Sequence, residues 1–293
     1  MLECVPNVSE GRATGTIELV ADACGASLLD VHRDVDHHRS VFTLAGPGER
    51  DATVAVRALA TEVLTHVDLG GHEGVHPRLG ALDVVPFVAL GDTPPPVAVD
   101  AARGFGKWVA ASLGAPVFFY GDADEQRRTL PSTRRSAFRD RPPDLVPGAR
   151  RSGAGAVAVG ARPVLVALNC ELDRDDRPLA VAIARDVREG APDGLAGVRA
   201  LGLRLASRER VQVSMNLVDL RRTGVERACA AVRDRARAAG ADVVRVELVG
   251  LLPSDELARC SDEFVEWSGL RADQTIEARL ALGPGDRAGH WRR

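Results

Sequence analysis

The order of secondary structure in this chain repeats twice, and the repeat restricts the fold more than any other feature of the sequence. In the first half, apolar residues recur at strand or helix spacing and predict β-α-β-β-α-β, followed by one more helix and one more strand. The predicted strands are residues 2–5, 27–31, 40–45, 82–90 and 116–120, and the predicted helices are residues 14–24, 56–67 and 97–113.

The second half repeats the β-α-β-β-α-β order without the addition. Its predicted strands are residues 164–169, 198–205, 211–217 and 243–249, and its predicted helices are residues 177–189 and 225–239. Thr223-Gly-Val-Glu226 has the spacing of a capping box and is expected to begin the last helix. Such an order is typical of a ferredoxin-like fold, in which helices cover one face of an antiparallel sheet.

Residues 121–155 separate the two repeats; they are rich in Arg, Pro, Asp and Ser and show no apolar periodicity. Loops of this length without secondary structure are uncommon unless they have a function. We therefore predict an α+β protein with two ferredoxin-like βαββαβ subdomains, the first at residues 1–155 and the second at residues 156–293. A small ligand is expected in the cleft between them.

The composition restricts the function to small-molecule chemistry. With 38 basic and 41 acidic residues the net charge is -3, so no bulk charge favours nucleic acid or an anionic membrane. Apolar runs such as residues 84–90 are far shorter than a membrane span. The first residues do not resemble a secretion signal, and the five cysteines are odd in number and widely spaced, which favours reduced thiols and a cytoplasmic protein. Lys107 is the single lysine, so arginine is expected to bind anions.

Six of the seven histidines fall between His32 and His76, which indicates a site. The string His72-Glu-Gly-Val-His76 formally matches the H-E-x-x-H zinc motif, in which both histidines share one helix face. Here Gly74 lies inside the string and Pro77 follows it, and both disfavour a helix. A zinc hydrolase remains only as a minor alternative.

The same loop ends in His76-Pro77-Arg78, which presents an imidazole beside a guanidinium. The imidazole can carry a proton near neutral pH and the guanidinium can hold a carboxylate. The alternative is a loop histidine that only satisfies nearby backbone groups.

Two other segments have a similar ambiguity. Residues 34–39 place acids, His37, His38 and Arg39 between two strands, and they either line a site or form an ordinary charged loop. Residues 7–12 follow the first strand, and their backbone N–H groups together with Arg12 either hold an anion or form a helix cap and turn.

Several segments of the sequence resemble the motifs of one known family. These strings are Glu3-Cys-Val-Pro-Asn-Val-Ser-Glu-Gly-Arg12, Leu28-Leu-Asp-Val31, His37-His-Arg-Ser-Val41, His72-Glu-Gly-Val-His-Pro-Arg-Leu-Gly-Ala-Leu-Asp-Val84, Gln212-Val-Ser-Met-Asn-Leu217 and Glu247-Leu-Val-Gly-Leu-Leu-Pro253. In this order they resemble the glutamate formimidoyltransferase family, which is the transferase part of formimidoyltransferase-cyclodeaminase. The resemblance covers nearly the whole chain and implies two ferredoxin-like subdomains with a folate site in the cleft.

The resemblance also implies an activity. A formimino group would pass from N-formimino-L-glutamate to N5 of tetrahydrofolate, a step of histidine degradation and one-carbon metabolism in which the folate is a co-substrate. It implies no metal, and it suggests a homodimer.

Site residues follow from the matched positions. The family's catalytic histidine falls on His76, which would act as general base and acid. Arg39 and Arg78 are expected to hold carboxylates through charge-assisted hydrogen bonds, with His37, Asn7 and Arg12 as further binding residues. The folate-binding loop falls on Val146, Pro147, Gly148, Ala149, Arg150, Arg151, Ser152, Gly153, Ala154 and Gly155.

The sequence departs from the family pattern at several positions, among them Arg150, Arg151 and Ala154 of the expected folate-binding loop. Asp144-Leu-Val-Pro147 stands where the family has Asp-Phe-Gly-Pro, His38 replaces an asparagine, and Glu171 adds a negative charge within Asn169-Cys-Glu-Leu172. These differences leave an alternative open, namely a non-catalytic or re-specialised homologue that binds folate or another anionic metabolite.

Overall fold

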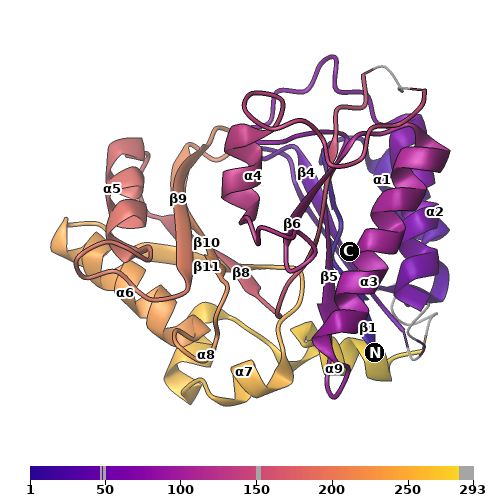
Figure 1. The fold of residues 1–293 in the computed structure, drawn as a ribbon. Helices are drawn as coiled ribbons and strands as arrows, with labels where there is room; N and C mark the ends of the chain where they lie inside the picture. The colour runs from indigo at the N-terminus through magenta and orange to yellow at the C-terminus, as the bar shows by residue number, and fades with distance from the viewer. Residues whose placement is uncertain (47, 49–50, 150–152, 284–293) are drawn as a thin grey trace. The chain divides into compact units, whose positions relative to one another are not determined.

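The computed structural model describes residues 1–46, 48, 51–149 and 153–283 (Figure 1). The chain divides into two compact units, Met1–Pro163 and Val164–Leu282. Each unit contains its own sheet and its own buried apolar core, so the α+β fold with two subdomains is confirmed. Arg150, Arg151 and Ser152 of the expected folate-binding loop lie outside the described residues.

The first unit has a seven-stranded mixed sheet. Its elements in chain order are β1 (Leu2–Cys4), β2 (Asn7–Val8), α1 (Thr14–Ala23), β3 (Leu28–Asp34), β4 (Arg39–Ala45), α2 (Asp51–His66), β5 (Leu82–Ala89), α3 (Pro95–Trp108), β6 (Val117–Gly121), α4 (Leu130–Ser136) and β7 (Val157–Ala161). The strands β1 and β2 both pair antiparallel with β4 and with β5, while β3 pairs with the other edge of β4. These pairings form the ferredoxin-like part, and β7 and β6 extend it by parallel pairing beside β5.

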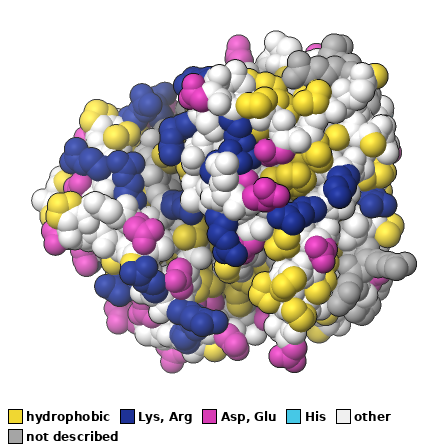
Figure 2. All heavy atoms as spheres, in the orientation of Figure 1, with side chains coloured by type: hydrophobic (Ala, Val, Ile, Leu, Met, Phe, Trp, Pro, Cys, Tyr) yellow, Lys and Arg dark blue, Asp and Glu magenta, His cyan; other side chains and the backbone are white. Residues whose placement is uncertain are grey.

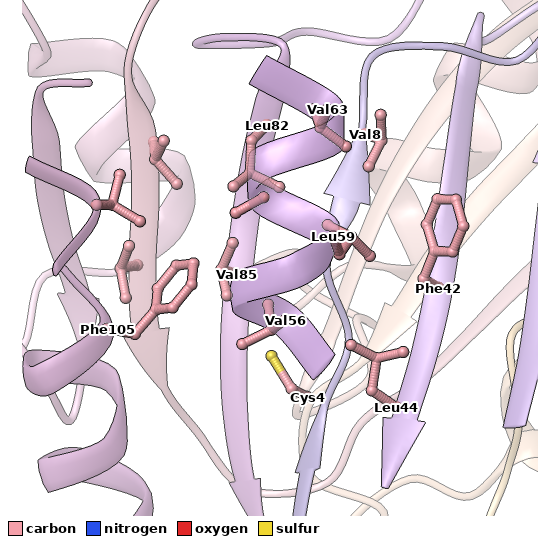
Figure 3. Packing of buried hydrophobic residues seen from close by; sticks show 14 of the residues in the cluster. Cys4, Val8, Phe42, Leu44, Val56, Leu59, Val63, Leu82, Val85 and Phe105 are labelled. Atoms are coloured by element: carbon pink, nitrogen blue, oxygen red, sulfur yellow. The ribbon is translucent and has the colours of Figure 1, made fainter. Parts of the chain in front are cut away.

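The two faces of this sheet have different roles. Helices α1, α2 and α3 lie together on one face, on the right in Figure 1. Apolar side chains from both helices and strands fill this layer, as Figure 3 shows for Phe42, Leu59, Val85 and Phe105. The opposite face has a smaller apolar cluster and the short helix α4. The polar residues discussed below therefore lie outside the main core.

The second unit is a four-stranded antiparallel sheet in the order β11-β8-β10-β9. Its elements are β8 (Val166–Leu172), α5 (Arg177–Val187), β9 (Val198–Leu205), β10 (Arg210–Leu217), α6 (Val225–Ala238) and β11 (Val243–Val249), followed by α7 (Ser254–Ala258), α8 (Asp262–Ser268) and α9 (Ile276–Ala281). This is the expected βαββαβ order. Alternate residues of each strand pack beneath α5 and α6, which is the pattern that the period-2 alternation predicts.

The division between the units lies after Pro163, whereas the sequence placed it after Gly155. The strand β7 explains the difference. It pairs with β5 and β6 of the first sheet, so the segment that follows the long connection still belongs to the first unit. The connection also contains the helix α4, whose seven residues are too few to show an apolar period.

The expected capping box at the start of α6 was wrong. The N-cap residue is Gly224, and Thr223 instead donates a hydrogen bond from its hydroxyl to the carbonyl oxygen of Ala196 at 2.8 Å. The backbone N–H of Val225 donates to Oε1 of the buried Glu256 at 2.7 Å. A carboxylate distant in sequence therefore stabilises the positive end of this helix.

No helix in the described part of the chain is long and apolar enough to span a membrane. On the face drawn in Figure 2, basic and acidic side chains are interspersed, which agrees with the near balance of charge in the sequence. The cysteines at positions 4, 24, 170 and 229 are buried free thiols, and Cys260 is a partly exposed one.

Candidate active site

Three loops of the first unit come together at one end of its sheet. The loop before β5 packs on the turn between β3 and β4, where the N–H of Val75 donates to the carbonyl oxygen of Asp36 at 3.2 Å. Gly74 makes this approach possible, because a Cβ atom there would lie 2.2 Å from the carbonyl oxygen of His37. The third loop follows β2 and is joined by Ser9, whose hydroxyl donates to the carbonyl oxygen of Gly80 at 2.8 Å. The segments that the sequence singled out are thus neighbours in space.

His76 lies in this group of loops and is partly exposed. Its Nδ1 atom is 2.8 Å from the carbonyl oxygen of Pro77 and 3.2 Å from Nη1 of Arg39. A ring nitrogen cannot donate to a carbonyl and accept from a guanidinium at the same time. The shorter contact assigns the proton to Nδ1, which donates to Pro77 and leaves the lone pair of Nε2 as the basic position of the ring.

The surroundings of His76 keep its imidazole neutral. Burial lowers the pKa of His76 well below 6.5, and the nearby positive charges of Arg39 and Arg134 and the ring of His37 lower it further. The hydrogen bond to Pro77 opposes this shift without cancelling it. The imidazole of His76 is therefore unprotonated at physiological pH, which is the state from which a ring nitrogen can accept a proton.

Arg39, at the start of β4, is held by residues of β2 and β5. Its Nε and Nη2 atoms donate to Oδ1 of Asn7 at 2.9 and 2.7 Å, and its Nη1 atom donates to Oδ2 of Asp83 at 2.5 Å. Oδ2 of Asp83 also accepts from Nη2 of Arg134 in α4 at 2.5 Å, and Oδ1 accepts from the backbone N–H of Leu79 at 2.6 Å. Asp83 has no exposed side-chain surface, so one fully buried carboxylate fixes both arginines and the end of the histidine loop.

Arg78 closes the histidine loop from inside. Its Nη2 atom donates to the carbonyl oxygen of His72 at 2.7 Å, and its Nη1 atom lies 3.5 Å from the carbonyl oxygen of Gly74. Both ring nitrogens of His72 are also engaged: Nδ1 accepts from the N–H of Gly74 at 3.2 Å and Nε2 donates to the carbonyl oxygen of His38 at 2.8 Å. His72 would have to break one of these bonds to bind zinc, and no group of three or more potential ligands occurs among the described residues.

The remaining histidines support the loops. The ring of His37 is buried, with its centroid 5.8 Å from that of His76. The ring of His38 stacks on that of His72 at 4.0 Å, and its Nε2 atom lies 3.1 Å from Oε1 of Glu10. Burial raises the pKa of Glu10, but hydrogen bonds from the backbone and the interaction with His38 lower it by more, so this carboxyl is a stable anion.

Glu10 also determines what the loop after β2 can bind. Its Oε1 atom accepts from the backbone N–H groups of Arg12 and Ala13 at 2.7 and 2.9 Å. These two backbone donors are therefore occupied by a side chain of the protein. The exposed guanidinium of Arg12 donates from Nε to the carbonyl oxygen of Val35 at 3.0 Å.

The C-terminal end of the expected folate-binding loop lies next to the segment that follows His76. The carbonyl oxygen of Ala154 accepts from the N–H of Ala81 at 2.9 Å, and Gly155 forms a β-bridge with Gly80. Gly155 has φ of +70°, and a Cβ atom there would lie 2.3 Å from the carbonyl oxygen of Leu79. At the other end, Val146 is 69% exposed. The loop therefore ends directly beside the segment that follows His76, with Val146 on the surface.

In the second unit, the charge of Glu171 is compensated. Its carboxylate lies 3.0 Å from Nη1 of Arg208, 3.4 Å from Nε of Arg210 and 3.8 Å from Nη1 of Arg245. The neighbouring Asn169 donates from Nδ2 to Oε2 of Glu247 at 3.0 Å. Glu171 thus adds no net negative charge to this face of the sheet.

Asp83 and Arg134 are the residues of this site that sequence reasoning missed. Asp83 gave a signal, because an acidic residue inside an otherwise apolar strand is buried only with partners. Arg134 gave none, since it lies in a stretch with many arginines and no periodicity. Its part in the site became evident only from its hydrogen bond to Asp83.

An α+β chain with two ferredoxin-like units and a histidine beside two partly buried arginines is consistent with a transferase. The model of the formiminotransferase domain, N-terminal subdomain, matches residues 1–162, and that of the formiminotransferase domain matches residues 167–282. The chain belongs to the formiminotransferase domain family.

Curated relatives agree with this assignment. The chain is 34% identical over 299 residues to glutamate formimidoyltransferase of Thermoplasma acidophilum, covering 96% of this chain and 97% of that protein. It is 34% identical over 300 residues to glutamate formimidoyltransferase of Streptococcus pyogenes serotype M1, covering 97% and 99%. It is also 34% identical over 288 residues to formimidoyltransferase-cyclodeaminase of Gallus gallus, covering 91% of this chain and 52% of that protein.

Proposed function

We propose that this protein transfers the formimino group of N-formimino-L-glutamate to N5 of tetrahydrofolate and releases L-glutamate. The observation that supports this most directly is the setting of His76, whose Nδ1 lies 2.8 Å from the carbonyl oxygen of Pro77 and whose pKa is lowered by burial and by Arg39. The names of the curated relatives, glutamate formimidoyltransferase, support formimidoyl transfer, and tetrahydrofolate as the acceptor is part of the proposal.

The reaction needs one proton to move between two nitrogens. In the proposal, N5 of the folate forms a bond to the formimino carbon and gives a tetrahedral intermediate. Nε2 of His76 takes the proton from N5 and then gives it to the glutamate nitrogen, so that the bond from carbon to this nitrogen breaks. The imidazole returns to its neutral state, and no metal ion takes part in these steps. Such proton transfer contributes about 10²- to 10⁴-fold to a rate.

The other predicted binding residues are part of the proposal. His37, Asn7, Arg39 and Arg78 would orient the reacting groups by fixing the loops around His76, and Arg12 would lie at the edge of the site. Residues 146–155 would contact the folate. The proposal also includes a cytoplasmic homodimer, for which light scattering coupled to gel filtration provides the test.

The transfer is tested by mixing the purified protein with tetrahydrofolate and N-formimino-L-glutamate. Acid converts the expected 5-formimino product to a methenyl form, which is followed by its absorbance. His76→Ala should lower kcat by about 10²- to 10⁴-fold. His66→Ala is the matched control, because His66 is an exposed histidine of α2 whose ring pairs with Glu62 of the same helix. An unchanged rate in His76→Ala would refute the proposed role.

A second candidate is a homologue that binds folate or another anionic metabolite without turnover. The exposed Val146, in place of the family's glycine, favours it. Folate binding in calorimetry, combined with no product from any mixture of the two substrates, would select this candidate over the transferase.

A further inference from the structure

The arginines of the candidate site differ in how many of their guanidinium nitrogens already donate hydrogen bonds to other groups of the protein. Arg39 uses Nε, Nη1 and Nη2 on Asn7 and Asp83, and Arg78 uses both terminal nitrogens on backbone carbonyls of its own loop. These two arginines therefore stabilise the site from within. Arg134 differs, since its single hydrogen bond among the described residues runs from Nη2 to Asp83.

The Nε atom of Arg134 is buried and has no hydrogen-bond partner among the described residues. Buried N–H groups are rarely left without a partner, because the loss of water is then not compensated. An unsatisfied donor on a charged group next to a reactive side chain indicates a position where a ligand atom completes the hydrogen bonding.

The charges of Arg134 and its neighbours indicate which chemical group of a ligand would bind there. Asp83 is the one carboxylate bound by both Arg39 and Arg134, so the three residues together hold one excess positive charge. Neutral His76 adds none. A single carboxylate would neutralise this excess, whereas a phosphate dianion would exceed it, and guanidinium groups match the planar geometry of carboxylates.

The position of α4 fits this role. Leu130 packs against the apolar cluster of Val84, Tyr120 and Ala158 on the site face of the sheet, and Arg134 lies one helical turn after Leu130 on the same side of α4. The cluster fixes the helix, and Asp83 fixes the guanidinium. The arginine is thus held in place before a ligand arrives, which reduces the entropic cost of binding.

We propose that Arg134 binds one carboxylate of the formimino donor. This inference rests on the proposed function, because it names the group that holds the substrate of that reaction. It assigns Arg39 and Arg78 to positioning, in contrast to the expectation that they bind the carboxylates themselves.

The test compares Arg134→Gln, Arg134→Lys and Arg135→Gln with the wild type. Arg135 is the matched control, an exposed arginine on the same helix. Calorimetry measures the binding of L-glutamate and of glutarate, a dicarboxylate without an amino group, and steady-state kinetics measures KM for the donor and for tetrahydrofolate. Arg134→Gln should raise Kd for both dicarboxylates and KM for the donor by about 10- to 100-fold, as expected for the loss of a hydrogen bond to a charged group. KM for tetrahydrofolate should not change.

Arg134→Lys should recover part of the affinity, because it keeps the charge but lacks Nε. Circular dichroism shows whether each variant is folded, and Arg134→Lys alone decides the question if Arg134→Gln does not fold. Equal effects on both substrates, an unchanged Kd for the dicarboxylates, or wild-type protein that binds neither dicarboxylate would overturn the inference. Binding that depends on Arg134 in a protein without transfer activity would support the inference while refuting the proposed reaction.

Discussion

Two carboxylates in this molecule are each surrounded by more arginines than they can neutralise, and burial makes them different. Asp83 in the first unit has a fully buried side chain, and its partners Arg39 and Arg134 are only 11% and 17% exposed. Glu171 in the second unit is itself only 10% exposed, but its partners are 39% to 45% exposed. The first group acts in a medium of low dielectric, where charges strongly affect each other and nearby rings, whereas water screens the second.

This difference bears on the role proposed for His76. Buried charges beside His76 lower its pKa and hold its surroundings in one geometry. The exposed arginines around Glu171 can rearrange at little cost, since ion pairs at a surface contribute about 0–1 kcal/mol. The same residue types thus form a rigid frame in one unit and a solvated charge cluster in the other.

The largest expected effect comes from breaking the buried group. Asp83→Asn leaves two guanidinium groups buried without their counter-charge, and the loss of one partner from a buried ion pair costs about 3–5 kcal/mol. We therefore expect the free energy of unfolding, measured by urea titration, to fall by about this amount. A loss below about 1 kcal/mol would place Asp83 in the same class as a surface acid and remove the contrast with Glu171.

A smaller effect is expected in how the free energy of unfolding and the value of kcat/KM depend on pH. Because the pKa of His76 is lowered in the folded protein, the unfolded chain binds more protons between that pKa and 6.5. The unfolding free energy should therefore rise with pH through this window, and the stabilisation is lost as pH falls through the folded pKa. For the proposed reaction, the acid limb of kcat/KM should lie below pH 6.5 in the wild type.

Arg39→Gln sharpens this test, because Arg39 is the neighbouring charge that lowers the pKa of His76 most. In this variant the acid limb should move up towards 6.5, and titration of the ring of His76 by NMR should follow it. His66→Ala should leave both curves in place, since His66 is an exposed residue of α2 that pairs with Glu62 of the same helix. An acid limb that stays fixed in Arg39→Gln would show that the buried charges do not determine the protonation of His76.

Much of the fold could be predicted from the sequence, because its helices and strands show clear apolar periodicity. The position of β7 could not, since Val157–Ala161 joins the first sheet through parallel pairing with strands distant in the chain. In the site, the conjunction of Asn7, Arg39 and His76 was indicated by motifs. The hydrogen bonds among these residues could not be predicted. Only the structure shows that Asp83 accepts hydrogen bonds both from Arg39 and from Arg134 of α4, the helix between the two repeats.

The smallest expected effect comes from the exposed cluster. Glu171→Gln removes the acid from among three arginines, which then repel one another through water. We expect the free energy of unfolding to fall by no more than about 1 kcal/mol at low salt, and by less at roughly 1 M NaCl, where charges are screened beyond about 3 Å. Urea titrations at both salt concentrations measure this difference. A loss as large as that of Asp83→Asn, or one that does not depend on salt, would mean that Glu171 stabilises the second unit by a buried network, and that exposure of the arginines does not separate the two clusters.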